Sequence, residues 1–187
     1  MSARAAEFDA LYDGNPDPWR METSAYEAAK YDATLGALPR ARYRSGLEVG
    51  CSIGVLTARL AARCDRLVAL DVSARAIERA AARPGCEAVA FRRAEVPNEW
   101  PDGAYDLIVL SEVLYFLEPD EVREIARLTA RDLAPGGTVV AVNWLGECDR
   151  TLDGAAAADL FVTSLDAAFR TRTTVAEQYR IDVAVRD

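Results

Sequence analysis

Histidine is absent from the 187 residues of the sequence, and this absence excludes several kinds of catalytic site. A Ser-His-Asp triad, a histidine-ligated metal ion and an imidazole general base all need the missing side chain. Any proton transfer must therefore use Asp, Glu, Tyr, Lys, Cys or water. No Cys-x-x-Cys pair occurs either, so we expect no metal site and only reduced thiols at Cys51, Cys64, Cys86 and Cys148.

Long apolar runs are also missing from the chain. No stretch approaches the roughly 20 apolar residues that a membrane span needs, and residues 1–14 lack the apolar run of a secretory signal. We therefore expect a cytoplasmic protein that has no membrane partner. The net charge of -8 repels phosphate backbones, which argues against nucleic acid as a partner. An acidic site could still favour a cationic small molecule.

The hydrophobic content of 51% is sufficient for a single globular domain with a core. Two segments, 3–12 and 24–37, have helical periodicity. From residue 46 onward, short apolar segments alternate with helical patterns, which predicts an α/β fold with a doubly wound, mostly parallel sheet. We expect strands at 46–50, 66–71, 87–93, 105–111 and 138–144, helices at 55–64, 74–83, 121–133 and 154–169, and an antiparallel edge hairpin within 170–187.

Carboxylates follow three of the five predicted parallel strands. Ligands of open α/β sheets bind at the carboxyl ends of the strands, and these ends carry Asp71, Glu95 and Glu112. Asp71 lies 21 residues after Gly50, which is the spacing expected for an acid that binds the hydroxyls of a ribose. The alternative is that Asp71 or Ser73 caps the following helix.

The turn after the first strand, "EVGCSIG" at 48–54, differs from a dinucleotide-binding loop. Ser52 stands where such a loop has its second glycine, so a pyrophosphate would meet a side chain. No Gly-Lys-Ser/Thr follows, which excludes a Walker-type phosphate loop. The pattern indicates a nucleoside-like ligand without phosphate, its tail along the loop and Glu48 available to a cationic group. S-adenosylmethionine has a ribose, an adenine and an ammonium, and no phosphate.

Several longer stretches carry a family resemblance: N-P-D-P-W (15–19), LEVGCSIGVLTARLAARCDRLVALD (47–71), EVPNEWP (95–101), DLIVLSEVLYFL (106–117) and LAPGGTVVAVNW (133–144). With these, the chain resembles the class I S-adenosylmethionine-dependent methyltransferases, and within them the NodS-type branch, which N-methylates amino sugars on chitooligosaccharide backbones. The resemblance covers most of the chain. It implies a Rossmann-like, seven-stranded sheet with an antiparallel strand 7, and one domain (1–187) made of a helical N-terminal cap (1–40) over a core (41–187).

The resemblance also implies which residues hold the cofactor. Its methionine end would be lined by residues of the first strand and turn: Glu48, Gly50, Cys51, Ser52 and Gly54. Asp71 would bind the ribose hydroxyls, with Val72 beside the adenine. Glu95 would face the adenine amine, where the superfamily often has Asp, and the backbone of Val96 would bond to the ring. Ser111 would lie beside the sulfonium.

Three further residues complete the implied site. Glu112 would also lie beside the sulfonium, and Trp19 and Tyr26 of the cap would close the cofactor site. Relatives often carry a histidine just after strand five, where this chain has Asn143. The substrate of the nodulation enzymes therefore does not transfer directly to this chain.

Methyl transfer from a sulfonium is an in-line displacement in which the protein mainly positions the nucleophile. A neutral amine needs only an acceptor for the proton it first loses, so a histidine-free chain favours N-methylation of a small molecule, such as an amino sugar. O-methylation of a hydroxyl or carboxylate is the alternative. We predict Glu112 as the proton acceptor, unless it is simply an acid at a helix N-terminus. Tyr115 would line the substrate pocket or pack in the core, and the protein would be a monomer or homodimer.

Overall fold

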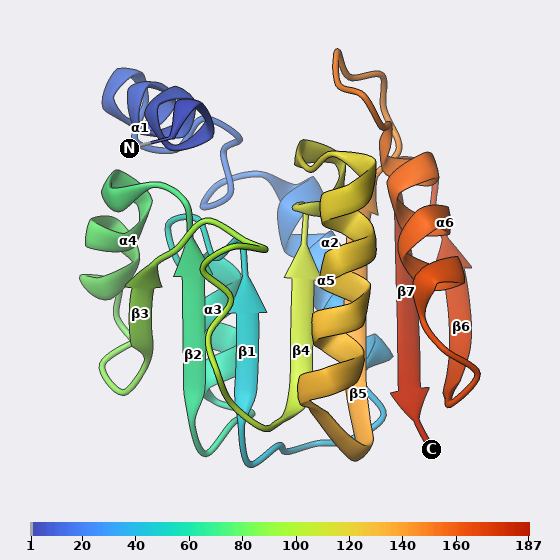
Figure 1. The fold of residues 1–187 in the computed structure, drawn as a ribbon. Coiled ribbons are helices and arrows are strands. Elements are labelled where there is room, and N and C mark those ends of the chain that lie inside the picture. Colours follow the sequence, from blue (N-terminus) through green and yellow to red (C-terminus); the bar gives the residue numbers. More distant parts are fainter. Residues whose placement is uncertain (1) are drawn as a thin grey trace.

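The computed structural model describes residues 2–187 and contains one seven-stranded sheet in the order β3-β2-β1-β4-β5-β7-β6 (Figure 1). β1 to β5 are parallel, and β7 is antiparallel to both of its neighbours, β5 and β6. The predicted Rossmann-like sheet and its antiparallel strand 7 are thereby confirmed. The strands are β1 (Gly46–Val49), β2 (Leu67–Asp71), β3 (Ala90–Arg93), β4 (Tyr105–Ser111), β5 (Leu133–Trp144), β6 (Phe169–Val175) and β7 (Tyr179–Arg186).

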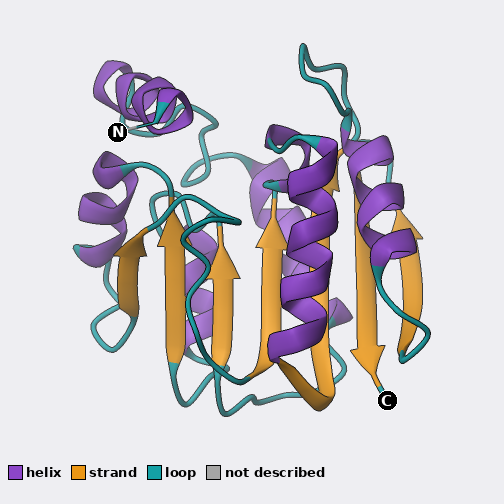
Figure 2. Cartoon of the chain, in the orientation of Figure 1, coloured by secondary structure: helices purple, strands orange, loops and turns teal. Residues whose placement is uncertain are grey.

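Helices cover both faces of the sheet, as the secondary-structure view in Figure 2 shows. α5 and α6 pack with one face, and α2 and α3 contribute to the apolar cluster on the other. Successive residues of β4 pack into opposite clusters: Ile108 lies in the cluster with α5 and α6, and Val109 in the cluster with α2 and α3. This is the two-residue period expected of a strand. The helices are α1 (Ala3–Gly14), α2 (Ala25–Ala37), α3 (Val55–Ala61), α4 (Ala74–Ala81), the 3₁₀ turn η1 (Leu114–Phe116), α5 (Pro119–Asp132) and α6 (Gly154–Ser164).

Some element ends differ from the prediction. The helix expected to reach residue 64 ends at Ala61, because Cys64 instead forms a parallel bridge with Tyr43. The helix expected to reach residue 169 ends at Ser164, and β6 begins at Phe169. Residues 135–137, expected to separate a helix from a strand, lie within β5, where the register with β4 shifts.

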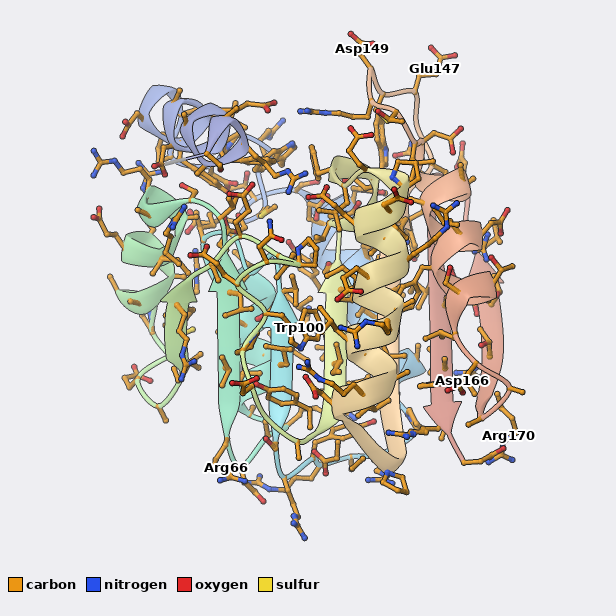
Figure 3. The ribbon with its side chains drawn as sticks, viewed as in Figure 1. Arg66, Trp100, Glu147, Asp149, Asp166 and Arg170 are labelled. Atoms are coloured by element: carbon orange, nitrogen blue, oxygen red, sulfur yellow. The ribbon has the colours of Figure 1, made fainter. Side chains whose placement is uncertain are left out.

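The carboxyl ends of β1 to β5 meet at one edge of the sheet, and α1 lies above this edge (Figure 1). The chain order reverses between the neighbours β1 and β4, which is the switch point where α/β sheets bind ligands. The loop between β5 and α6 also rises above this edge, with Glu147 and Asp149 at its tip (Figure 3). Across residues 2–187, none of the helices combines the length and the apolar character required to cross a membrane.

The N-terminal helices differ in what they cover. α2 supplies Tyr31 and Leu35 to the core on the face of the sheet that α3 also covers, whereas α1 contacts α4, the turn after β1 and α5. The division of the single domain into a cap of residues 1–40 and a core of 41–187 stays a prediction.

Candidate active site

A cavity of about 470 Å³ opens at the carboxyl edge, centred on the β1/β4 switch point. This volume lies within the range of small-molecule sites. Ten of the fourteen predicted site residues line it: Trp19, Tyr26, Gly50, Ser52, Asp71, Val72, Glu95, Val96, Glu112 and Tyr115. Four do not: Glu48, Cys51, Gly54 and Ser111. The sequence reasoning missed other lining residues, among them Arg4, Phe8, Tyr12, Met21, Glu27, Lys30, Val113, Phe116, Cys148 and Arg150.

The turn after β1 takes its shape from three residues in the left-handed region, Gly50 (φ 80°), Ser52 (φ 49°) and Gly54 (φ 81°). A Cβ atom at Gly50 would lie 2.2 Å from a methyl carbon of Val113, so only glycine fits there. Ser52 adopts the same region although it has a side chain. Its backbone N–H donates to Oδ2 of Asp71 at 2.8 Å, which ties the turn to the end of β2.

Asp71 occupies the end of β2 and faces the cavity while only 8% exposed. Its second oxygen, Oδ1, accepts the backbone N–H of Ser73 at 2.9 Å, and Ser73 itself is the N-cap of α4. Burial raises the pKa of Asp71 to about 6, against the opposing effect of the backbone donors. Each oxygen accepts one N–H, and a carboxylate has further lone pairs for hydroxyl donors. The geometry is therefore compatible with binding of a diol such as a ribose.

Ser52 also bonds to the helix above it. The Tyr12 hydroxyl of α1 and Ser52 Oγ are 2.5 Å apart, and either can be the donor. Burial keeps the Tyr12 phenol protonated by raising its pKa. The ring of Tyr12 meets that of Trp19 edge-on at 5.7 Å between centroids. The side chain at the second-glycine position thus connects the turn to α1.

Ion pairs hold α1 over the cavity. Arg4 pairs with Glu121 of α5 at 2.6 Å and with Glu95 at 3.5 Å. Glu7 pairs with Arg150 of the β5–α6 loop at 2.5 Å. These contacts join α1 to the segments that follow β3 and β5, on two sides of the cavity mouth.

Glu112 follows β4 with a left-handed φ of 58°, an uncommon backbone for a residue with a side chain. Its carboxylate accepts three hydrogen bonds: Oε1 from Lys30 Nζ at 2.6 Å, and Oε2 from the Tyr115 hydroxyl at 2.7 Å and the Trp144 N–H at 2.8 Å. Elements α2, η1 and β5 therefore converge on this one side chain. Burial and the neighbouring Glu112 raise the pKa of Tyr115, so its hydroxyl donates rather than acting as a base.

Lys30, the single lysine of the sequence, is buried against the cavity at 3% exposure. Its Nζ bridges two carboxylates, Glu112 at 2.6 Å and Glu27 at 3.0 Å. Burial lowers the pKa of Lys30, but the two carboxylates more than offset this and the pKa is raised above its ordinary value. Lys30 is therefore a fixed positive charge and not a nucleophile.

The structure does not bring Glu48 to the cavity, where the resemblance had placed it. Glu48 lies in the middle of the sheet on β1, 1% exposed, and its Oε2 has no hydrogen-bond partner. Successive residues of a strand face opposite sides, so Glu48 points into the core toward the α3 side rather than along the turn. Burial raises its pKa to about 7.

The other three predicted residues outside the lining are close neighbours of it. Cys51 and Ser111 are buried beside Gly50 and Glu112, and Gly54 is the N-cap of α3. Burial raises the pKa of the Cys51 thiol well above its ordinary value, so it is not a reactive thiolate. Among residues 2–187, no group of three or more carboxylate or thiol side chains could hold a metal ion.

Comparisons with known proteins identify the family of this chain. The family model for Nodulation protein S (NodS) matches residues 11–170. Nodulation protein S of Bradyrhizobium diazoefficiens is 37% identical over 127 residues, which cover 66% of this chain and 61% of that protein. The chain spans less than two thirds of the length of three curated nodulation proteins that it matches.

Two crystal structures have the same fold. A candidate methyltransferase from Pseudomonas syringae superposes with a TM-score of 0.75 at 32% identity, over 87% of this chain and 100% of that one. The N-methyltransferase NodS of Bradyrhizobium japonicum WM9, in complex with S-adenosyl-L-homocysteine, gives a TM-score of 0.78 at 23% identity, over 96% of this chain and 97% of that one. Since the family model extends over most of its length, the chain belongs to the Nodulation protein S family.

Proposed function

We propose that this protein is an S-adenosylmethionine-dependent methyltransferase that methylates the amine of a small molecule. The observation that carries the proposal is the cavity at the β1/β4 switch point. Three acids at the carboxyl ends of β2, β3 and β4 line it: Asp71, Glu95 and Glu112. Family membership supports the proposal, because a NodS enzyme has been crystallised with the demethylated cofactor.

The residues of the cavity fit this cofactor. Asp71 would bind the ribose hydroxyls, with Val72 and Val96 beside the adenine and Glu95 near its amine. Ser52 fills the space that a dinucleotide loop keeps open for pyrophosphate, and its hydroxyl is already bonded to Tyr12. When bound, the cofactor supplies an electrophilic methyl group on a sulfonium. The chain positions the acceptor, excludes water and receives a proton.

Glu112 is the proposed proton acceptor. An amine is a nucleophile only as the free base, so the acceptor must lose a proton before its nitrogen lone pair can form a bond to carbon. Lys30, Tyr115 and the Trp144 N–H hold the Glu112 carboxylate in one orientation. Trp19, which lines the cavity beside Tyr12 of α1, would help to exclude water when the cofactor is bound. We predict that Glu112→Gln lowers turnover at least tenfold at neutral pH and that the loss shrinks at high pH, where the acceptor amine is already deprotonated. A loss that is the same at all pH values would contradict this role.

Calorimetry tests the cofactor directly. We expect S-adenosylhomocysteine to bind with a micromolar Kd or better and NAD not to bind, because Ser52 obstructs a pyrophosphate. No binding of S-adenosylhomocysteine would refute the proposal. Tight binding of NAD would instead favour a dehydrogenase or a nucleotide-sugar enzyme with the same fold.

Three further statements are predictions from the sequence and the family resemblance. They are an amino-sugar acceptor, a cytoplasmic location and a monomeric or homodimeric state. O-methylation remains the alternative reaction. A hydroxyl acceptor needs a stronger base than an amine, and neither Lys30 nor Tyr115 is one.

A further inference from the structure

The cluster of Glu27, Lys30 and Glu112 holds two formal negative charges and one positive charge in a buried place. Glu27 is 7% exposed and Lys30 3%, and all three residues line the cavity. In such surroundings solvent screens charges weakly. The uncompensated charge of the cluster is therefore felt by whatever occupies the cavity beside Glu112.

Lys30 is shared between the two carboxylates and does not neutralise Glu112 alone. Its Nζ is 2.6 Å from Oε1 of Glu112 and 3.0 Å from Oε1 of Glu27. Glu27 Oε2 is buried and has no hydrogen-bond partner. Burial, and next to it the Glu27 carboxylate, raises the pKa of the Tyr31 hydroxyl. Among residues 2–187, Lys30 is the only cation that pairs with Glu27 or Glu112, so the two carboxylates compete for it.

The other cations at the cavity do not relieve this excess. Arg4 pairs with Glu95 and Glu121, and Arg150 pairs with Glu7. Arg4 belongs to α1 and Arg150 to the loop between β5 and α6. The positive charges of Arg4 and Arg150 are therefore already paired with carboxylates outside the cluster.

Strand order places this cluster at the end of the cavity away from Asp71 and Glu95. Asp71 and Glu95 follow β2 and β3, on one side of β1, whereas Glu112 follows β4 on the other side. α2 lies toward β7, where the ring of Tyr26 meets Tyr179 at 6.0 Å between centroids. A nucleoside bound between β3 and β1 leaves the region between β4, β5 and α2 for the methyl acceptor.

We propose that Glu27 gives this site its selectivity for a cationic acceptor, by drawing the charge of Lys30 away from Glu112. Glu27 is a positioning residue in this scheme, since it acts through Lys30, and a protonated amine completes the charge balance of the cluster. The inference rests on the proposed function, because it assumes that the acceptor enters beside Glu112.

The test uses a cofactor analogue whose charge lies at the transfer point. Sinefungin carries an amine in place of the sulfonium methyl, and S-adenosylhomocysteine carries neither. The ratio of their dissociation constants, measured by calorimetry, reports how strongly the site prefers a cation. We expect Glu27→Gln to weaken this preference about ten- to hundredfold, the effect of one buried charge at this range, with the Kd of S-adenosylhomocysteine little changed.

Two variants separate charge from packing. Adding Lys30→Met to Glu27→Gln restores the formal charge of the cluster, so the double variant should recover most of the preference. Tyr31→Phe removes a hydroxyl next to Glu27 without changing any charge and should leave the ratio unchanged. If Glu27→Gln fails to fold, Lys30→Gln alone should move the ratio in the opposite direction.

An acceptor pair extends the test to the substrate. With S-adenosylhomocysteine bound, glucosamine should bind more tightly than N-acetylglucosamine, and Glu27→Gln should abolish the difference. The inference is overturned if Glu27→Gln leaves the sinefungin ratio unchanged, if it weakens both analogues equally, or if the double variant behaves like the single one. Failure of the wild-type protein to bind S-adenosylhomocysteine would overturn the proposed function itself, so the two failures are distinguishable.

Discussion

Replacing Glu48 with glutamine tests how a buried carboxylate in the centre of the sheet affects stability. Burial raises the pKa of Glu48 from an ordinary 4.5 to about 7. The unfolded chain therefore ionises this group more readily than the folded protein does. As pH rises from 4.5 to 7, ionisation of Glu48 lowers the free energy of the unfolded state but not that of the folded state, so stability falls. A shift of this size corresponds to about 3 kcal/mol.

Glu48→Gln removes this pH-dependent contribution, since an amide does not ionise. We expect the free energies of unfolding of the variant and the wild type to be similar near pH 4.5. Near pH 8 the variant should be more stable by up to about 3 kcal/mol. Urea denaturation followed by circular dichroism at both pH values measures the difference. The affinity for S-adenosylhomocysteine should change less than about twofold, because Glu48 does not line the cavity.

Glu177→Gln is the matched control, because Glu177 is exposed in the turn between β6 and β7. It should give the same stability difference from wild type at both pH values. The reasoning about Glu48 is refuted if Glu48→Gln behaves like this control, or if its advantage is largest at low pH. A large loss of cofactor affinity in Glu48→Gln would show that the side chain reaches the methionine end after all.

Three further predictions concern the turn and the helix above it. Asp71→Ala should weaken binding of S-adenosylhomocysteine by roughly 1–3 kcal/mol in calorimetry, if Asp71 accepts the ribose hydroxyls; an unchanged affinity would exclude that role. Tyr12→Phe breaks the bond to Ser52 and should weaken the same affinity by about 0.5–1.5 kcal/mol, whereas Tyr105→Phe, which removes a phenol hydroxyl outside the cavity lining, is the control and should leave it unchanged. Gly54→Ala should lower the free energy of unfolding by about 1–3 kcal/mol, since φ is 81° and the new Cβ would lie 3.0 Å from that of Ala80; a thermal melt equal to wild type would contradict this strain.

The sequence was sufficient to predict the sheet and one side of the site. Apolar strands alternating with helices have few alternatives to a parallel sheet, and parallel strands bring their carboxyl ends to one edge. The acids that follow these strands, Asp71, Glu95 and Glu112, were therefore expected together, and the cavity has all three. The exception is Glu48, because its position within the strand, two residues before the turn, directs it into the core.

The other side of the site depends on contacts between distant segments. Glu27 and Lys30 are three residues apart on a helix, a spacing typical of a solvent-exposed pair. They are buried because α2 packs against β7 and reaches the end of β4, which no local pattern reveals. The bond between Tyr12 and Ser52 likewise joins residues 40 positions apart. Side chains from distant segments that meet only in the folded protein leave no periodic signal in the sequence.

Lys30 is a natural reporter group for the cavity, because the sequence has no other lysine. Amine-directed reagents can modify only this side chain and the α-amino group, because the sequence has one lysine. Isotope-labelled reductive methylation would thus give a single side-chain resonance from inside the cavity. Since Nζ is clamped between two carboxylates, the rate at which the label enters measures how often α2 and the end of β4 separate.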